Sequence, residues 1–229
     1  MKTPRILLAA AAAAILAACG GGAPPDDGGP PPTEATLWPL GTGARWTYRV
    51  TDPLLGVFQK VVRVEGQGTV PGSGAGGGLP AVLVRDVEPS LDETSWQVRD
   101  GGLVFRAREE DRRDGAVVRT TTWSPAEMKA ISKLPPGGWV HDSTVHQTIA
   151  HADGTVTEKD ERFVWTVAAT DERVTVPAGT FDGCVRVVRT NPEKPGSERT
   201  YWLAPGVGKV KETGERTEEL LSYEPPPAG

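Results

Sequence analysis

The sequence predicts a mainly β domain: a curved antiparallel sheet, forming a half-barrel or open barrel, with one short helix. Three observations lead to this prediction. β-Branched and aromatic residues recur in short alternating runs. Gly, Pro and Asp-Gly pairs separate these runs, as turns between neighbouring strands require. A single segment has the spacing of a helix instead.

The expected strands fall into two groups on either side of that segment. The first group is 46–50, 57–65, 81–88, 95–99, 103–108 and 117–123. The second group is 139–150, 155–169, 173–176, 184–190, 199–203, 208–212 and 217–223. So many short strands around one helix favour an antiparallel sheet that curls.

The expected helix covers residues 125–134. Ser124 can cap its N-terminus, and Pro125 suits the first turn because that position needs no backbone N–H. Met128, Ile131 and Leu134 would then share one apolar face.

Asp153-Gly154 is the strongest turn signal in the chain, because a two-residue hairpin turn favours residues that tolerate positive φ. Counting outward from this turn sets the register of the hairpin. The expected pairs are Ala152 with Thr155, His151 with Val156, His146 with Glu161 and Thr144 with Phe163. Phe163, Trp165 and Val167 share one face, which we expect to point into the core.

Asp114-Gly115 indicates a second hairpin, and its tip at 109–114 is a run of mixed charge. Glu109 and Glu110 could be imagined as the acid and base of an active site. Adjacent residues at a solvated tip have neither the burial nor the cleft that would separate their pKa values. We therefore interpret both as surface residues.

The N-terminal segment has the pattern of a secretory signal. Lys2 and Arg5 precede an unbroken run of Ile, Leu and Ala at 6–18. A helix of this length rises roughly 20 Å, which is too short for a hydrocarbon core of about 30 Å. We expect the segment to be cleaved.

The end of this segment, Leu16-Ala17-Ala18-Cys19, resembles the bacterial lipobox. In that motif the cysteine receives a diacylglycerol and becomes the new N-terminus, and two or three acyl chains anchor a protein firmly. Gly20, where Asp would retain a lipoprotein at the inner membrane, resembles the outer-membrane sorting pattern. The alternative is an ordinary secretory signal that ends near a cysteine.

Composition then divides the chain into four parts. They are the signal peptide at 1–18, the lipidated Cys19 with a Gly/Pro-rich tether at 19–35, a single β-rich domain at 36–224 and a Pro-rich tail at 225–229. The formal net charge of −5 falls to −7 when Lys2 and Arg5 leave with the signal. This balance disfavours nucleic acid as a partner.

Parts of the domain resemble a broad group of exported bacterial β-proteins of uncharacterised function. The similar segments are 39–48, 176–187, 201–211 and 219–223, and they include Val176-Pro177-Ala178-Gly179-Thr180-Phe181 and Tyr201-Trp202-Leu203-Ala204-Pro205-Gly206. The resemblance implies a curved, mostly antiparallel sheet, distantly like the half-barrels of periplasmic lipoprotein carriers. It supplies no catalytic residue.

The sequence holds few candidates for chemistry. His141, His146 and His151 stand five apart, so successive members face opposite sides of a strand, and we expect no metal site. Cys184 has no disulfide partner if Cys19 is acylated, and its strand-like surroundings favour a buried, inert thiol over a reactive one. The sequence contains no Gly-x-Ser-x-Gly motif, no His-Glu-x-x-His motif and no phosphate loop. We expect no enzyme activity and no cofactor beyond the acyl anchor on Cys19.

Seven tryptophans are many for this length. They can fill the concave side of a curved sheet, or some can line an open cavity. The candidates for such a cavity are Trp46, Trp139, Trp165 and Trp202.

Two functions follow from these features. The first is a non-enzymatic lipoprotein of the bacterial cell envelope, anchored to the outer membrane and acting as a structural or interaction module for another envelope protein. The alternative is a carrier or sensor that binds an apolar ligand (a lipid, glycan or peptide) in a cavity of the curved sheet. A closed, filled core would exclude the alternative, and a pocket lined by several of the tryptophans would favour it.

Overall fold

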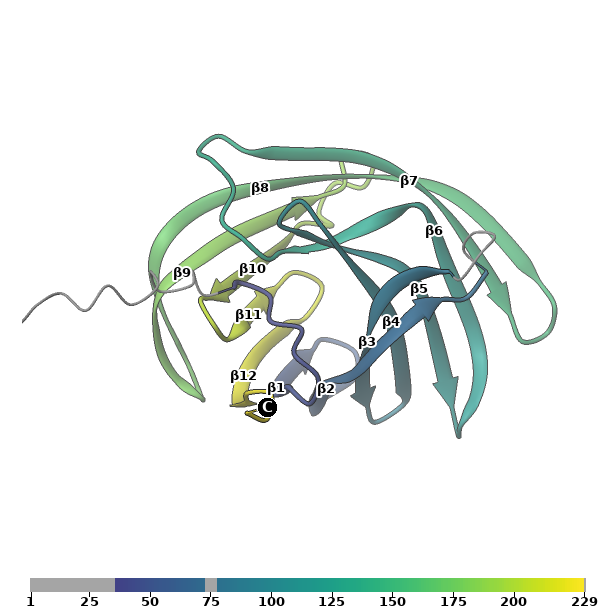
Figure 1. Cartoon of the computed structure of the whole chain (residues 1–229), viewed down its shortest axis with the longest axis horizontal. Helices are drawn as coiled ribbons and strands as arrows, with labels where there is room; N and C mark the ends of the chain where they lie inside the picture. Colours follow the sequence, from purple (N-terminus) through teal and green to yellow (C-terminus); the bar gives the residue numbers. More distant parts are fainter. Residues whose placement is uncertain (1–35, 73–77, 229) are drawn as a thin grey trace, which may run out of the picture. The chain divides into compact units, whose positions relative to one another are not determined.

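The computed structural model describes residues 36–72 and 78–228, which form a closed antiparallel barrel (Figure 1). Each strand pairs with its neighbours in the chain, and the last strand pairs with the first. The strands within the described residues are β1 (Arg45–Asp52), β2 (Gly56–Val70), β3 (Leu79–Glu88), β4 (Leu91–Asp100), β5 (Leu103–Arg113), β6 (Ala116–Ile131), β7 (Val140–His151), β8 (Val156–Val176), β9 (Gly179–Thr190), β10 (Arg199–Ala204), β11 (Gly208–Thr213) and β12 (Thr217–Glu224).

The mainly β, antiparallel prediction is confirmed, but the open sheet, the break between two expected strands and the short helix are wrong. The sheet closes completely instead of stopping at a half-barrel or an open barrel. Closure satisfies the backbone groups that two free edge strands would leave unpaired. The runs expected at 155–169 and 173–176 also join into one long strand, β8, which bends where its pairing with β9 is irregular.

The expected helix at 125–134 is wrong, because β6 continues to Ile131. Met128 pairs with Phe105 and Ala130 pairs with Val104, which leaves Lys129 as the extra residue of a β-bulge. A bulge places residues three apart on the same face of a strand. Met128 and Ile131 are therefore both buried in one cluster, and their spacing imitates that of a helix. Leu134 lies beyond the strand and is exposed. No helix long and apolar enough to cross a membrane occurs in the described part of the chain.

The β7–β8 hairpin turns at the expected place, but its register differs by one residue. His151 N donates to Thr155 O, so three residues, Ala152 to Gly154, form the loop. Ala150 therefore pairs with Val156. The other expected pairs are replaced by His146 with Asp160 and Thr144 with Arg162. Phe163 and Trp165 still face the core, as expected.

The β5–β6 turn at Asp114-Gly115 is confirmed. Both residues have positive φ, and Arg113 pairs with Ala116 across them. The strands run on to this turn, however, so the segment expected as a solvated tip is mostly strand. Glu109 and Asp111 point inward and are 5% and 3% exposed.

The inward face of the barrel follows the alternation of each strand. On β1, Trp46, Tyr48 and Val50 are buried and alternate with more exposed residues. On β2, Lys60 and Val64 are buried in the same alternating way. Charged and apolar side chains therefore share the barrel interior.

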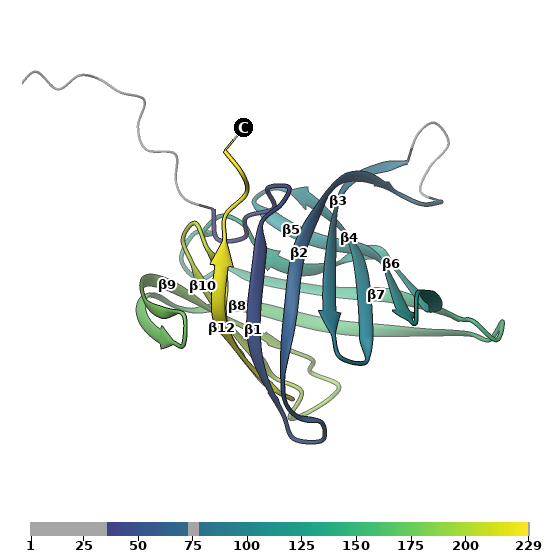
Figure 2. The same ribbon diagram turned by 90° about the horizontal axis from the view of Figure 1, so that it is seen from below.

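Residues 36–44 cross one end of the barrel before β1 begins (Figure 1, purple). Leu37 N donates to Ser132 O and Gly206 N donates to Thr36 O, both at 2.9 Å. Leu37 is buried against the barrel wall. The C-terminus lies at this same end, opposite the β1–β2 turn (Figure 2). The segment acts as a cap, and part of it lines the interior.

Candidate functional site

A cavity of about 170 Å³ lies inside the barrel. Every strand except β7 contributes a lining residue, and the cap contributes Trp38, Pro39 and Leu40. The volume is below the roughly 300–1,000 Å³ of pockets for drug-sized ligands. It suits a small molecule better than a long acyl chain.

One part of the cavity wall is aromatic, formed by Trp38, Trp46, Tyr48, Trp165 and Tyr201. Trp165 and Tyr201 stack with their ring centroids 5.4 Å apart. Most of the polar atoms of these rings have fixed partners. Trp46 Nε1 donates to Val207 O at 2.6 Å, Tyr48 OH donates to Lys209 O at 2.9 Å, and Trp38 Nε1 donates to Gln97 Oε1 at 3.1 Å. These bonds hold the rings as rigid walls.

Another part of the wall is charged, with seven cationic and five acidic residues. The cationic residues are Lys60, Arg106, Lys129, Arg189, Arg199, Lys209 and Arg216, and the acidic residues are Asp86, Glu93, Glu127, Glu212 and Glu218. Buried charges are stable only when they are paired. The pairing of each group therefore decides what the cavity can bind.

Glu218 organises the first ion-pair network. Its carboxylate lies 2.6 Å from Lys209 Nζ, 3.5 Å from Lys60 Nζ and 2.7 Å from an Arg216 nitrogen. Lys209 also reaches Glu212 at 2.5 Å. Burial alone would raise the pKa of Glu218, but the three cations hold it well below its usual range. This network stays charged at neutral pH.

Glu127 organises the second network. Arg106 donates to it at 2.7 Å and Arg189 at 3.2 Å. The Arg106 guanidinium also lies 4.2 Å from the centre of the Trp123 ring, a cation–π contact. Both cations lower the pKa of Glu127 despite its burial.

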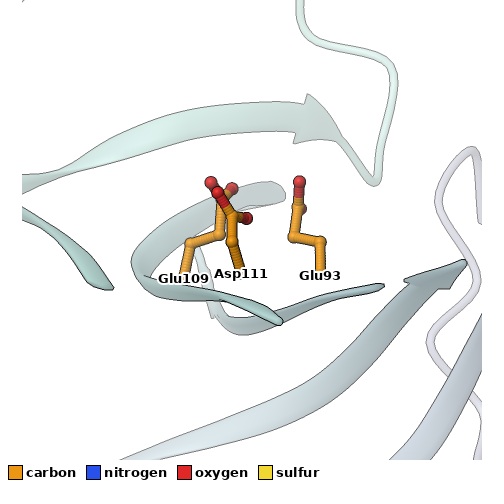
Figure 3. Close-up of side chains that lie close together, drawn as sticks. All are labelled: Glu93, Glu109 and Asp111. Carbon is orange, nitrogen blue, oxygen red and sulfur yellow. The ribbon is translucent and has the colours of Figure 1, made fainter. Parts of the chain in front are cut away.

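Three carboxylates meet beside this network: Glu93 on β4 and Glu109 and Asp111 on β5 (Figure 3). One oxygen of each lies within 4.8 Å of the others. Arg106 binds Glu109 and lies 3.8 Å from Glu93. Arg119 lies 2.5 Å from Asp111. Carboxylates alone would suit a hard cation. Here guanidinium groups bind Glu109 and one oxygen of Asp111, whereas Asp111 Oδ1 is buried without a hydrogen-bond partner among the described residues.

Protonation also relieves the charge of this acidic cluster. Burial and the nearby Glu109 and Asp86 carboxylates raise the pKa of Glu93 to about 8. At neutral pH Glu93 is therefore mostly uncharged. The two arginines then balance Glu109 and Asp111, so charge neutrality requires no metal ion.

The surface interpretation of Glu109 is corrected by these contacts. Glu109 is almost fully buried, while Glu110 on the opposite face binds Arg108 and Arg112. The signal that could have shown this is the alternation itself. Glu109 and Asp111 occupy every second position of a strand that simply continues through the charged run.

Lys129 differs from the other cations of the cavity. Across residues 36–72 and 78–228, no hydrogen bond or ion pair reaches its amino group. Its half-buried side chain lines the cavity. Burial and the nearby Arg106 lower its pKa. Sequence reasoning missed Lys129, because it lies inside the segment that was expected to be helical.

Of the four tryptophans expected at a cavity, Trp46 and Trp165 line it and the other two do not. Trp202 Nε1 donates to Glu172 at 2.9 Å, and Trp139 lies beside His141. Trp38, which was not among the candidates, lines the cavity from the cap.

The remaining sequence candidates have these positions. His141 is half-buried and stacks on Trp139, whereas His146 is exposed and bonds Asp160, so the histidines do not converge on one face. Cys184 is fully buried, and burial raises the pKa of its thiol to about 11, in agreement with an inert cysteine. Leu16, Ala17, Ala18 and Cys19 lie outside the described residues.

No family model and no curated protein matches the chain. Two crystal structures resemble it. A "putative lipoprotein" from Parabacteroides distasonis ATCC 8503 is 14% identical with a TM-score of 0.39, over 84% of this chain and 100% of that one. A "putative exported protein with YmcC-like fold" from Bacteroides fragilis NCTC 9343 is 13% identical with a TM-score of 0.40. The match covers 83% of this chain and 99% of that one. At these TM-scores neither likeness establishes the fold or the function of this chain.

Proposed function

We propose that the chain is a lipid-anchored protein of the bacterial envelope whose barrel binds a small polar ligand and catalyses no reaction. The lipobox-like Leu16-Ala17-Ala18-Cys19 supports the anchor. The observation that supports ligand binding is the cavity of about 170 Å³, with its aromatic walls and charged groups.

The charges in the wall favour a polar ligand over the apolar one expected from the tryptophans alone. An acyl chain in this cavity would cover charged groups without offering them hydrogen bonds, which is costly. A ligand with its own charged or hydrogen-bonding groups replaces the lost water contacts.

Native mass spectrometry of the domain tests this proposal. Residues Ala35–Gly229 form a compact unit of their own, so the domain can be produced without the anchor. We expect a small ligand to accompany the wild-type domain, or to bind from a panel of small polar compounds.

A matched pair of variants locates that binding. Val62 is half-buried and lines the cavity, so Val62→Phe should reduce binding by filling it. Val57 lies on the same strand and is 68% exposed, so Val57→Phe should bind like wild type. If no ligand binds, or if Val62→Phe binds as well as Val57→Phe, the barrel is a structural or interaction module instead.

A further inference from the structure

Lys129 is presented to the cavity by an irregularity of the fold. It is the extra residue of the β6 bulge opposite Val104 and Phe105. Bulges redirect a side chain out of the regular alternation, and they are frequent beside functional sites. Here the bulge adds a lysine to a wall whose neighbouring positions hold Glu127 and Met128.

No carboxylate of the described residues forms an ion pair with Lys129, and the attraction of the nearby Glu93 and Asp86 only partly offsets the effects of burial and Arg106 on its pKa. Glu218 and Glu212 bind Lys209, and Asp86 binds Lys60 at 2.9 Å. Glu127 binds two arginines. Glu93 is the remaining acidic residue of the lining, and its raised pKa of about 8 keeps it mostly neutral at pH 7. Within the described residues, Lys129 is therefore the one cation of the cavity lining that no carboxylate pairs with.

An anion from outside the chain would supply the partner that Lys129 lacks. A carboxylate held by the Lys129 amino group makes a charge-assisted hydrogen bond, which is stronger than a bond between neutral groups. The aromatic walls, among them Trp38, Trp165 and Tyr201, suit a flat or apolar body attached to that carboxylate.

We propose that Lys129 recognises the carboxylate of a small organic acid bound in the barrel cavity. This inference rests on the proposed function, which requires a small polar ligand there, and it adds the class of ligand and the residue that selects it.

Matched acid and amide probes test the proposal by calorimetry at pH 6.5. The pairs are benzoate with benzamide and butyrate with butyramide, so each pair differs mainly in charge. We expect the wild-type domain to bind at least one acid more tightly than its amide. Lys129→Met should reduce that preference roughly 10- to 100-fold, the range typical for a hydrogen bond to a charged group.

Two further variants separate recognition from stability. Lys129→Arg keeps the positive charge and should retain a measurable preference for the acid. Lys133→Met removes an exposed lysine that does not line the cavity, so it should leave the preference unchanged. Thermal unfolding of each variant shows whether the barrel remains folded.

The outcomes distinguish the inference from the function on which it rests. Equal binding of acid and amide, blocked by Val62→Phe, retains a binding cavity but contradicts selection by Lys129. An acid preference that survives in Lys129→Met also contradicts it. If neither the acids nor the amides bind and no ligand accompanies the purified domain, both proposals are wrong.

Discussion

Glu93 is the acidic side chain of the cavity lining whose pKa is raised by burial. It lies near Glu109 and Asp86 and only 3.8 Å from Arg106, yet its pKa is raised to about 8. The charged groups around it are Lys60 on β2, Asp86 on β3, Arg106, Glu109 and Asp111 on β5, and Lys129 on β6. The unfavourable burial of its charge outweighs the attraction of the cations.

Glu93→Gln should change how stability depends on pH. A raised carboxyl pKa means that the folded state keeps a proton that the unfolded state loses above about pH 4.5. Stability from Glu93 is therefore complete below that pH and is lost as the pH rises towards 8, by at most about 1.4 kcal/mol per unit. Chemical denaturation should show the variant close to wild type at pH 5 and more stable by roughly a few kcal/mol at pH 9.

Glu158→Gln is the control for this measurement, because Glu158 is exposed on β8. It should keep the pH dependence of the wild type. A Glu93→Gln variant with the same pH dependence as wild type would show that Glu93 titrates normally in the folded state.

At the scale of single elements, turns and bulges decide which residues reach the interior. The β5–β6 turn depends on positive φ at Asp114 (51°) and Gly115 (82°). An L-residue with a Cβ is strained in this region, and glycine is not.

Gly115→Ala should therefore lower the free energy of unfolding by roughly 1–2 kcal/mol. Gly137→Ala is its control, since a Cβ at either position meets nothing within 4 Å and only Gly115 has a positive φ. Denaturant unfolding of both variants measures the difference. Equal stability of the two would contradict a role for backbone strain at this turn.

Local sequence patterns predicted the strands well and their inner faces poorly. Gly and Asp-Gly turns marked where strands end, because turn chemistry is local. The interior charges were hidden, because inward Lys60 and Glu109 alternate with outward apolar or charged residues and give no clear hydrophobic period. The bulge at Lys129 converted a strand pattern into a helical one. Lys129 reaches the cavity because of how β6 pairs with β5. That pairing joins distant parts of the chain, so no local sequence pattern could predict it.

At the scale of the whole molecule, the membrane anchor proposed at Cys19 is tested on the full chain. Cys19→Ala should leave the full precursor uncleaved and without an acyl chain, because lipobox processing requires the cysteine thiol. Mass spectrometry of the N-terminal peptide after membrane fractionation measures both. Cys184→Ala is the control and should be processed normally. Acylation that persists in Cys19→Ala would refute the lipobox assignment.

Ion pairs, as well as strand pairing, link the strands at which the barrel closes. β11 and β12 share two register pairs, Lys211 with Glu219 and Glu212 with Glu218. Glu218 also binds Lys209 on β11 and Lys60 on β2, so its carboxylate connects strands on both sides of β12 and β1. These contacts are buried, and salt therefore screens them weakly.

Glu218→Gln should consequently lower the free energy of unfolding by about 3–5 kcal/mol, because it leaves buried cations without their shared partner. The adjacent Glu219→Gln is the control. Glu219 pairs with the half-exposed Arg49 outside the barrel, and its loss should cost at most about 1 kcal/mol. Because the cations hold the pKa of Glu218 well below its usual range, its stabilisation is present above about pH 4.5 and is lost only as the pH falls towards the folded-state value. Denaturation of wild type and both variants at pH 7 measures these costs, and equal destabilisation by the two substitutions would show that the interior network does not help to close the barrel.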